Sequence, residues 1–210
     1  MLTICNASSL AIDKFCDQAR RQSTIVVCFY LESASQEEQS PTDVLGSLLK
    51  QLVNGLDNIP KEVLDVFRDE KMGLGGRALR FAQIETLFHT ITSSQRTIIC
   101  VDALDECRVR DRLELLNSLR EILRKSPGTR LFLTGKPDIQ SEIQTQLGGA
   151  VTVVSITTTK DSVINLLCAR LDKDPTPEAM DSKLEADILN IFTQAMPNTY
   201  VWLMAVGNPA

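Results

Sequence analysis

Four short apolar runs, separated by helical patterns, constrain the fold of this chain more than any other feature. They occupy residues 24–31, 97–102, 130–135 and 151–156 and are rich in Val, Ile, Leu and Thr. Their continuous apolar character is typical of strands that are covered on both faces, as in a parallel sheet. Strands that alternate with helices along a chain are joined by right-handed crossovers. The sequence therefore predicts an α/β fold in which one parallel sheet of four strands has helices on both faces.

The helical patterns have clear starts and stops. Ser40 can cap a helix, Pro41 suits its first position, and Asp43 faces the free amides of its first turn. Apolar residues at helical spacing follow them, and further stripes run through residues 84–91 and 113–123. These faces are expected to pack against the sheet.

After residue 156 the alternation of strands and helices ends. Residues 158–210 carry helical patterns and a last apolar stretch over residues 200–206, which we also assign to a helical segment. We therefore predict two parts, an α/β core over residues 1–157 and the start of a helical subdomain over residues 158–210.

Composition excludes several classes of function. A formal net charge of −5 and an aromatic content of 5% argue against nucleic-acid binding. The single histidine argues against His-rich zinc sites and Ser-His-Asp triads, and the six cysteines show no metal-binding spacing. A solvated helix face explains most of the basic residues near 108–112. No apolar run approaches the roughly 18 residues that span a bilayer. We expect a cytoplasmic protein that binds neither nucleic acid nor membrane.

Three acidic residues follow the second apolar run, namely Asp102, Asp105 and Glu106. A carboxylate at the end of a parallel strand lies at the sheet edge where α/β proteins bind ligands. Because acids this close repel each other, a cation is expected between them and a phosphate ligand. The alternative is a capped turn in which Asp105 and Glu106 favour the start of the next helix. Spacing alone leaves both interpretations open.

A basic residue, Lys136, follows the third apolar run. From the same sheet edge its ammonium group could reach a γ-phosphate. The alternative is a surface lysine in a turn.

Together these segments resemble the NACHT family of STAND P-loop NTPases, the core of NOD-like receptors, and especially its fungal-type nephrocystin-like N-terminal branch. Residues 102–106 are similar to that family's Walker B motif, in which a small residue, here Ala103, follows the magnesium aspartate. The resemblance extends through residues 40–52, 133–139 and 175–181, in order, and so covers nearly the whole chain.

The resemblance implies a role for each residue at this edge. Asp102 would hold magnesium through water, Asp105 or Glu106 would orient or polarise the attacking water, and Lys136 would be the sensor residue. The family usually has Arg at the sensor position, and Lys lacks the bidentate fork that suits a phosphate. The intact parent would use ATP and Mg²⁺ as a signalling switch, engage protein partners through effector and sensor or repeat domains, and form an oligomer.

One family element is absent from the sequence, the Walker A loop G-x-x-x-x-G-K-[S/T] that cradles phosphates. Gly135-Lys136 is followed by Pro137, and the glycines at 73–76 are followed by no Lys-Ser or Lys-Thr. The resemblance places Met1 just after this loop, with the first, central strand also upstream. We therefore expect a fragment that neither binds ATP tightly nor hydrolyses it. The alternative is a non-enzymatic scaffold or protein-interaction remnant.

Overall fold

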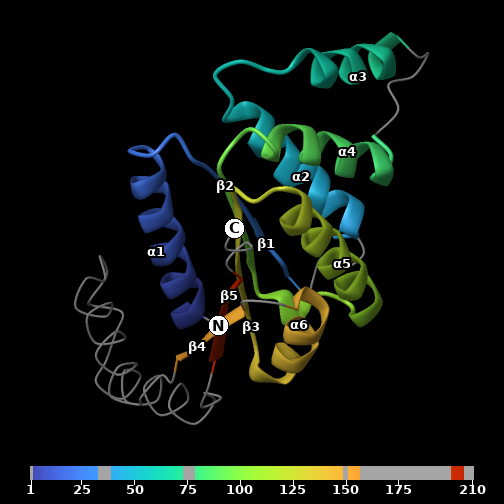
Figure 1. Ribbon diagram of the computed structural model, residues 1–210. Helices are drawn as coiled ribbons and strands as arrows, with labels where there is room; N and C mark the ends of the chain where they lie inside the picture. The colour runs from blue at the N-terminus through green and yellow to red at the C-terminus, as the bar shows by residue number, and fades with distance from the viewer. Residues whose placement is uncertain (1, 33–38, 73–78, 149–150, 157–199, 206–210) are drawn as a thin grey trace, which may run out of the picture.

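The computed structural model describes residues 2–32, 39–72, 79–148, 151–156 and 200–205. Five strands form one sheet in the order β1-β2-β3-β5-β4, and helices cover both of its faces (Figure 1). The predicted α/β fold is confirmed. The predicted helical segment over 158–199 lies outside the described residues.

Three strands are parallel, as predicted: β1 (Ile25–Tyr30), β2 (Thr97–Asp102) and β3 (Thr129–Gly135). β1 pairs with β2 and β2 pairs with β3. All residues of β2 except Ile98, and all of β3 except Arg130, are buried. This burial explains why both runs are continuously apolar, because layers of helix cover both faces.

The rest of the sheet differs from the prediction of four parallel strands. β4 (Val151–Ile156) does not pair with β3. Between them lies β5 (Tyr200–Ala205), which is antiparallel to both. The assignment of residues 200–206 to a helical segment was therefore wrong for 200–205. A short apolar run fits a buried strand as well as a helix, and here the unpaired backbone groups of β3 and β4 decide the outcome.

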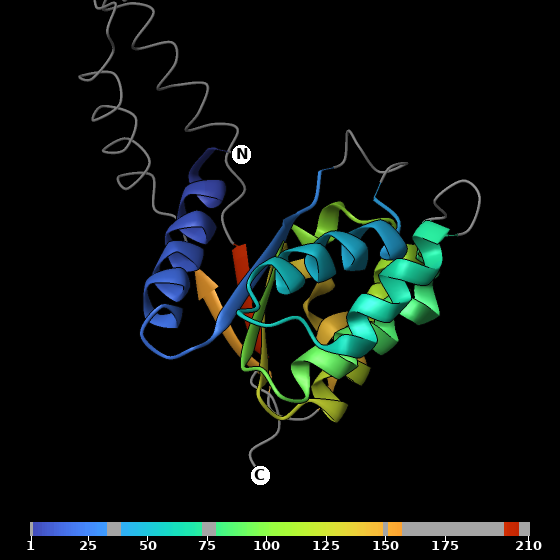
Figure 2. The ribbon, with the colours of Figure 1, turned by 90° about the horizontal axis from the view of Figure 1, so that it is seen from above.

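Helices form a layer on each side of the sheet, as Figure 2 shows from above. One layer is α1 (Leu2–Ala19), which lies against β1 and β2. The other side carries α2 (Pro41–Asn54), α4 (Phe81–Thr92), α5 (Val109–Lys125) and α6 (Gln140–Leu147). The remaining helix, α3 (Lys61–Met72), contributes Val63 to the core on the same side.

Helix α2 begins as the sequence predicts and also protects an edge of the sheet. The Ser40 side chain accepts from the Asp43 N–H at 3.3 Å, and the Asp43 carboxylate accepts from the Ser40 N–H at 3.2 Å. The Gln51 side chain bonds both backbone groups of Cys28 in β1, at 2.9 and 2.8 Å. Since β1 ends the sheet, this side chain occupies backbone groups that would otherwise be free to pair with another strand.

Two apolar clusters hold the layers together. The larger one joins the sheet to α2, α4, α5 and α6 and is built mainly of Leu, Ile and Val. The smaller one lies under α1, where Ile12 packs with Cys100 and Phe132. There the Phe15 ring meets the Phe132 ring edge to face, with centroids 5.1 Å apart. Within the described part of the chain, no helix is long and apolar enough to cross a membrane.

Candidate functional site at the carboxyl edge of the parallel strands

The parallel strands bring the acidic and basic candidates to one edge of the sheet. β2 ends at Asp102 and β3 ends at Gly135, and Val101 pairs with Leu133. Asp102 therefore lies beside Thr134, and Lys136 leaves the sheet at the same edge. The sequence predicts that Asp102 and Lys136 lie at the same edge of the sheet, and this placement is confirmed.

The side chain of Asp102 is fixed by Thr134, a residue that the sequence analysis did not single out. Asp102 is only 4% exposed. The Thr134 hydroxyl donates to a carboxylate oxygen of Asp102 and accepts from the Ala103 N–H at 2.9 Å. A single hydroxyl thus joins the ends of the two strands and sets the direction of the carboxylate.

Ala103 has a left-handed backbone, with φ 56° and ψ 47°. This conformation costs an L-residue roughly 1–2 kcal/mol, and a β-branched residue adopts it rarely. It turns the chain sharply out of the sheet into a short 3-10 helix over Leu104–Glu106. The left-handed turn is therefore a structural reason for a small residue, Ala103, at this position.

The turn brings Asp105 and Glu106 to Lys136. The Lys136 Nζ lies 2.8 Å from Asp105 Oδ2 and 3.5 Å from Glu106 Oε1, and the Lys136 N–H donates to Asp105 Oδ1 at 3.1 Å. The Asp105 and Glu106 side chains are 9% and 14% exposed, while that of Lys136 is 50% exposed. The hydrogen bond to Asp105 raises the pKa of Lys136 above its ordinary value, although burial acts in the opposite direction.

Gly135 allows this close approach. A Cβ at this position would lie 2.7 Å from the Ile139 Cδ1 and 3.4 Å from the Asp105 Oδ1. The Ile139 contact is shorter than any ordinary carbon–carbon contact, so a larger residue would require the end of the Ile139 side chain to shift. Glycine between Thr134 and Lys136 leaves room for both neighbours.

A buried ion pair anchors the segment that follows the turn. Arg112 on α5 forms two parallel bonds to Glu142 on α6, at 2.7 and 2.9 Å, and also donates to the Cys107 carbonyl at 3.1 Å. The Arg112 side chain is 8% exposed. Arg112 is therefore the exception to the solvated face that explains most of the basic residues, whereas Arg108 and Arg110 are exposed.

The edge suits a magnesium ion better than it suits a phosphate. Carboxylate oxygens are magnesium ligands, and Mg²⁺ commonly keeps several waters and uses one or two carboxylates. Among the described residues no group of three or more His, Cys, Asp or Glu side chains is placed to hold a metal directly. A role for Asp102 through water is compatible with this geometry and stays a prediction. For a phosphate the sequence provides no Walker A loop, and Lys136 is engaged by Asp105.

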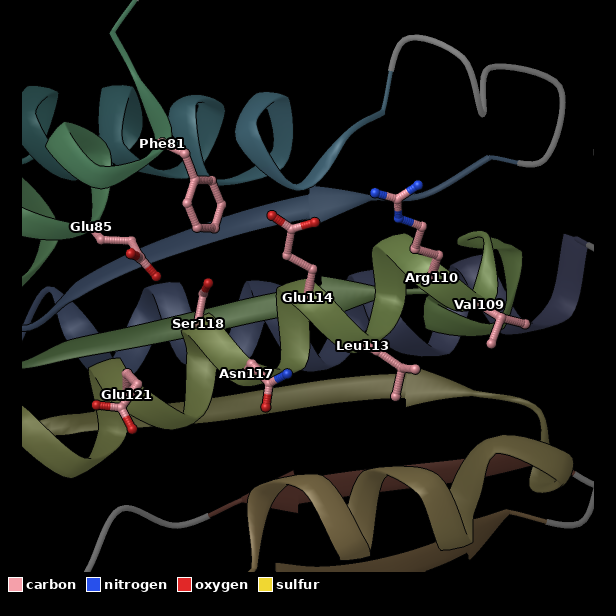
Figure 3. Close-up of a pocket in the computed structure, with 9 residues that line it drawn as sticks. All are labelled: Phe81, Glu85, Val109, Arg110, Leu113, Glu114, Asn117, Ser118 and Glu121. Carbon is pink, nitrogen blue, oxygen red and sulfur yellow. The ribbon is translucent and has the colours of Figure 1, made fainter.

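A groove lies elsewhere on the surface, between α4 and α5. It encloses about 790 Å³, and its lining combines the apolar Phe81 and Leu113 with the acidic Glu85 and Glu114 (Figure 3). None of the predicted site residues lines it. The candidate site remains the carboxyl edge of β2 and β3.

A protein-family model matches a large part of this chain. Residues 7–136, more than half of the chain, match the family model described as Nephrocystin 3, N-terminal. The matched segment includes the turn after β2 and ends at Lys136. No curated protein and no solved structure matches the chain.

Proposed function

Because this chain belongs to the nephrocystin 3 N-terminal domain family, we propose that it forms part of the core of a NACHT-type STAND P-loop NTPase, a signalling switch controlled by ATP. The convergence of Asp102, the Asp105–Glu106 pair and Lys136 at one sheet edge carries this proposal. A strand-end carboxylate at the ligand-binding edge of a parallel sheet, with further acids and a cation beside it, is compatible with a magnesium–phosphate ligand.

Each residue has a part in this proposal. Asp102, oriented by Thr134, would face the water shell of a magnesium ion. When bound, Mg²⁺ would neutralise charge on the phosphates of ATP. Asp105 or Glu106 would orient or polarise the attacking water, and both carboxylates contact Lys136. Asp105, which also accepts from the Lys136 N–H, would in addition position Lys136 as the sensor.

The chain itself should neither bind ATP tightly nor hydrolyse it. Its sequence has no G-x-x-x-x-G-K-[S/T] loop. The charge-assisted bonds that such a loop makes to phosphates contribute roughly 1.5–3 kcal/mol each. Among the described residues, the Lys136 ammonium group lies at this edge and is already engaged by Asp105.

A second candidate is a scaffold without turnover, and the ion pairs of Lys136 with Asp105 and Glu106 are compatible with it, because the ammonium group is engaged within the protein without a ligand. In either case we place the protein in the cytoplasm. Its partners would be proteins engaged through effector and sensor or repeat domains of an oligomeric parent, and not nucleic acid.

Calorimetric titration of the chain with Mg-ATP tests this proposal, with Asp102→Ala as the matched variant. We expect no binding at micromolar ATP in either protein. Micromolar affinity that Asp102→Ala abolishes would mean that this edge binds nucleotide without a phosphate loop, and our proposal would then be wrong.

A further inference from the structure

We propose that the groove between α4 and α5 binds a basic, partly apolar segment of a partner protein, anchored by an arginine side chain. The groove lies apart from the edge of β2 and β3, since neither Asp102 nor Lys136 lines it. The inference therefore does not depend on a nucleotide at the sheet edge. It assigns a second function, recognition of a protein partner, to the surface of this chain.

Two carboxylates of the groove have no cationic partner within the described ranges of the chain. Glu85 on α4 is half-buried and Glu114 on α5 is exposed. Arg110 lies one helical turn before Glu114, yet it forms no ion pair with either carboxylate. The third carboxylate, Glu121, is already paired with Arg124 at 2.8 Å. The groove therefore has free negative charge that attracts a cation from outside.

The floor of the groove holds a polar group without a partner. Ser118 on α5 is only 4% exposed, and among the described residues its hydroxyl has no hydrogen-bond partner. Buried polar side chains nearly always have one. The hydroxyl points toward the ring of Phe81, with Glu85 on one side and Glu114 on the other (Figure 3). An unpaired hydroxyl between two carboxylates suits a positively charged hydrogen-bond donor.

The ring of Phe81 favours arginine over lysine as the anchor. This ring is half-buried and faces the same space as the two carboxylates (Figure 3). A guanidinium group stacks on an aromatic face, and its five N–H donors can serve two carboxylates and a hydroxyl together. A lysine ammonium has three donors and is more strongly hydrated, so it gains less on entering the groove.

The shape of the groove favours a protein segment over a small molecule. The groove encloses about 790 Å³, but Glu114 and Arg110 on its wall are exposed, so a small ligand would remain largely in water. Small-molecule sites bury most of their ligand. Val109, which is 60% exposed, and Leu113 add apolar surface that a longer segment would cover. Phosphate-rich partners are disfavoured by the free carboxylates.

An NMR titration with Nα-acetyl-arginine amide tests the anchor by itself. We expect the backbone amides of residues 81–85 and 114–118 to shift on titration. Nα-acetyl-citrulline amide has nearly the same shape without the charge and should not bind, and the lysine analogue should bind more weakly than arginine. Equal binding of the citrulline compound, or shifts confined to other parts of the chain, would overturn the proposal.

Matched variants separate the two free carboxylates from the net charge of the groove. Glu85→Gln combined with Glu114→Gln should weaken arginine binding about tenfold, and Ser118→Ala should weaken it about threefold. The melting temperature of the double variant should not fall, because it loses no ion pair within the described protein. Glu121→Gln is the control, since Arg124 already engages that carboxylate, and it should change the affinity little. Equal weakening by the control, or a folded double variant that binds like wild type, would overturn the proposal.

A random peptide library displayed on phage tests the chemistry of the partner. Selection is made on the wild-type chain, with the Glu85→Gln and Glu114→Gln double variant as the counter-target. We expect the enriched peptides to combine arginine with neighbouring apolar residues. Enriched peptides without arginine, or no enrichment, would contradict the proposal. Self-association of the wild-type chain in sedimentation that the double variant lacks would show that a second copy occupies the groove, and would overturn it as well.

Discussion

At the scale of single residues, the backbone of Ala103 sets the geometry of the site. Its left-handed conformation directs the chain from β2 toward Lys136, and its N–H binds Thr134. The size of this side chain therefore matters for folding as well as for any ligand.

We predict that Ala103→Val lowers the free energy of unfolding by about 1–3 kcal/mol, because a β-branched residue is strained at positive φ. Ala103→Gly should be neutral or slightly stabilising, since glycine adopts this conformation freely. Urea denaturation measures both, with Ala82→Val on the exposed side of α4 as the control for β-branching in general. A valine variant at 103 that is no less stable than the control would refute this account of the turn.

Thr134 is the second residue whose role can be measured. Thr134→Val keeps the shape but removes the hydroxyl that binds Asp102 and Ala103. Losing these two hydrogen bonds at a buried position should cost about 1–3 kcal/mol of unfolding free energy. Thr134→Ser should recover most of that loss. If serine and valine destabilise equally in chemical denaturation, the hydroxyl is not what joins the two strand ends.

At the scale of elements, the pair of Arg112 and Glu142 fastens α5 to α6 just behind the site. Removing one partner of a buried, bidentate pair leaves the other charge uncompensated and typically costs about 3–5 kcal/mol. We predict a loss near the lower end of that range for Arg112→Met, because Glu142 remains partly exposed. The exposed pair of Arg124 and Glu121 is the matched control, and Arg124→Met should change the melting temperature little. Equal effects of the two variants would show that the buried pair does not anchor the helices.

Elements with strong local signals were predictable, and those that depend on distant partners were not. The three parallel strands and α2 follow from continuous apolar runs and from the Ser40 capping box. Helices α3 and α6 were not predicted, because they are short or mostly polar. β5 was assigned to a helical segment, because its strand character depends on β3 and β4 more than on its own sequence.

The residues of the candidate site also divide into those with a local sequence signal and those whose position depends on a distant partner. The placement of Asp102, Asp105, Glu106 and Lys136 at one sheet edge was predictable, because each lies at or just after the end of a recognisable strand, whereas their functional roles stay predictions. Thr134 was missed, since a threonine inside an apolar strand looks like an ordinary strand former. The signal that could have found it is its register position beside Asp102, which appears only once β2 and β3 are paired.

At the scale of the whole molecule, β5 is an interior strand of the described sheet, and Lys136 pairs with Asp105 and Glu106 at its edge. The sequence provides no G-x-x-x-x-G-K-[S/T] loop. Our account therefore predicts a chain that folds by itself but acquires a nucleotide response only when a strand and a phosphate loop precede it.

Thermal melting with and without Mg-ATP tests this claim most directly. The protein to use is the chain fused behind about 30 residues that supply a strand, a phosphate loop G-x-x-x-x-G-K-[S/T] and a first helical turn. We predict that Mg-ATP raises its melting temperature, since a ligand at 100 times its Kd adds about 2.7 kcal/mol of stability. Asp102→Asn should weaken the magnesium-dependent part of this rise, and Glu106→Gln should spare the rise while slowing turnover. An extended protein whose melting temperature does not respond to Mg-ATP would contradict the nucleotide-switch account.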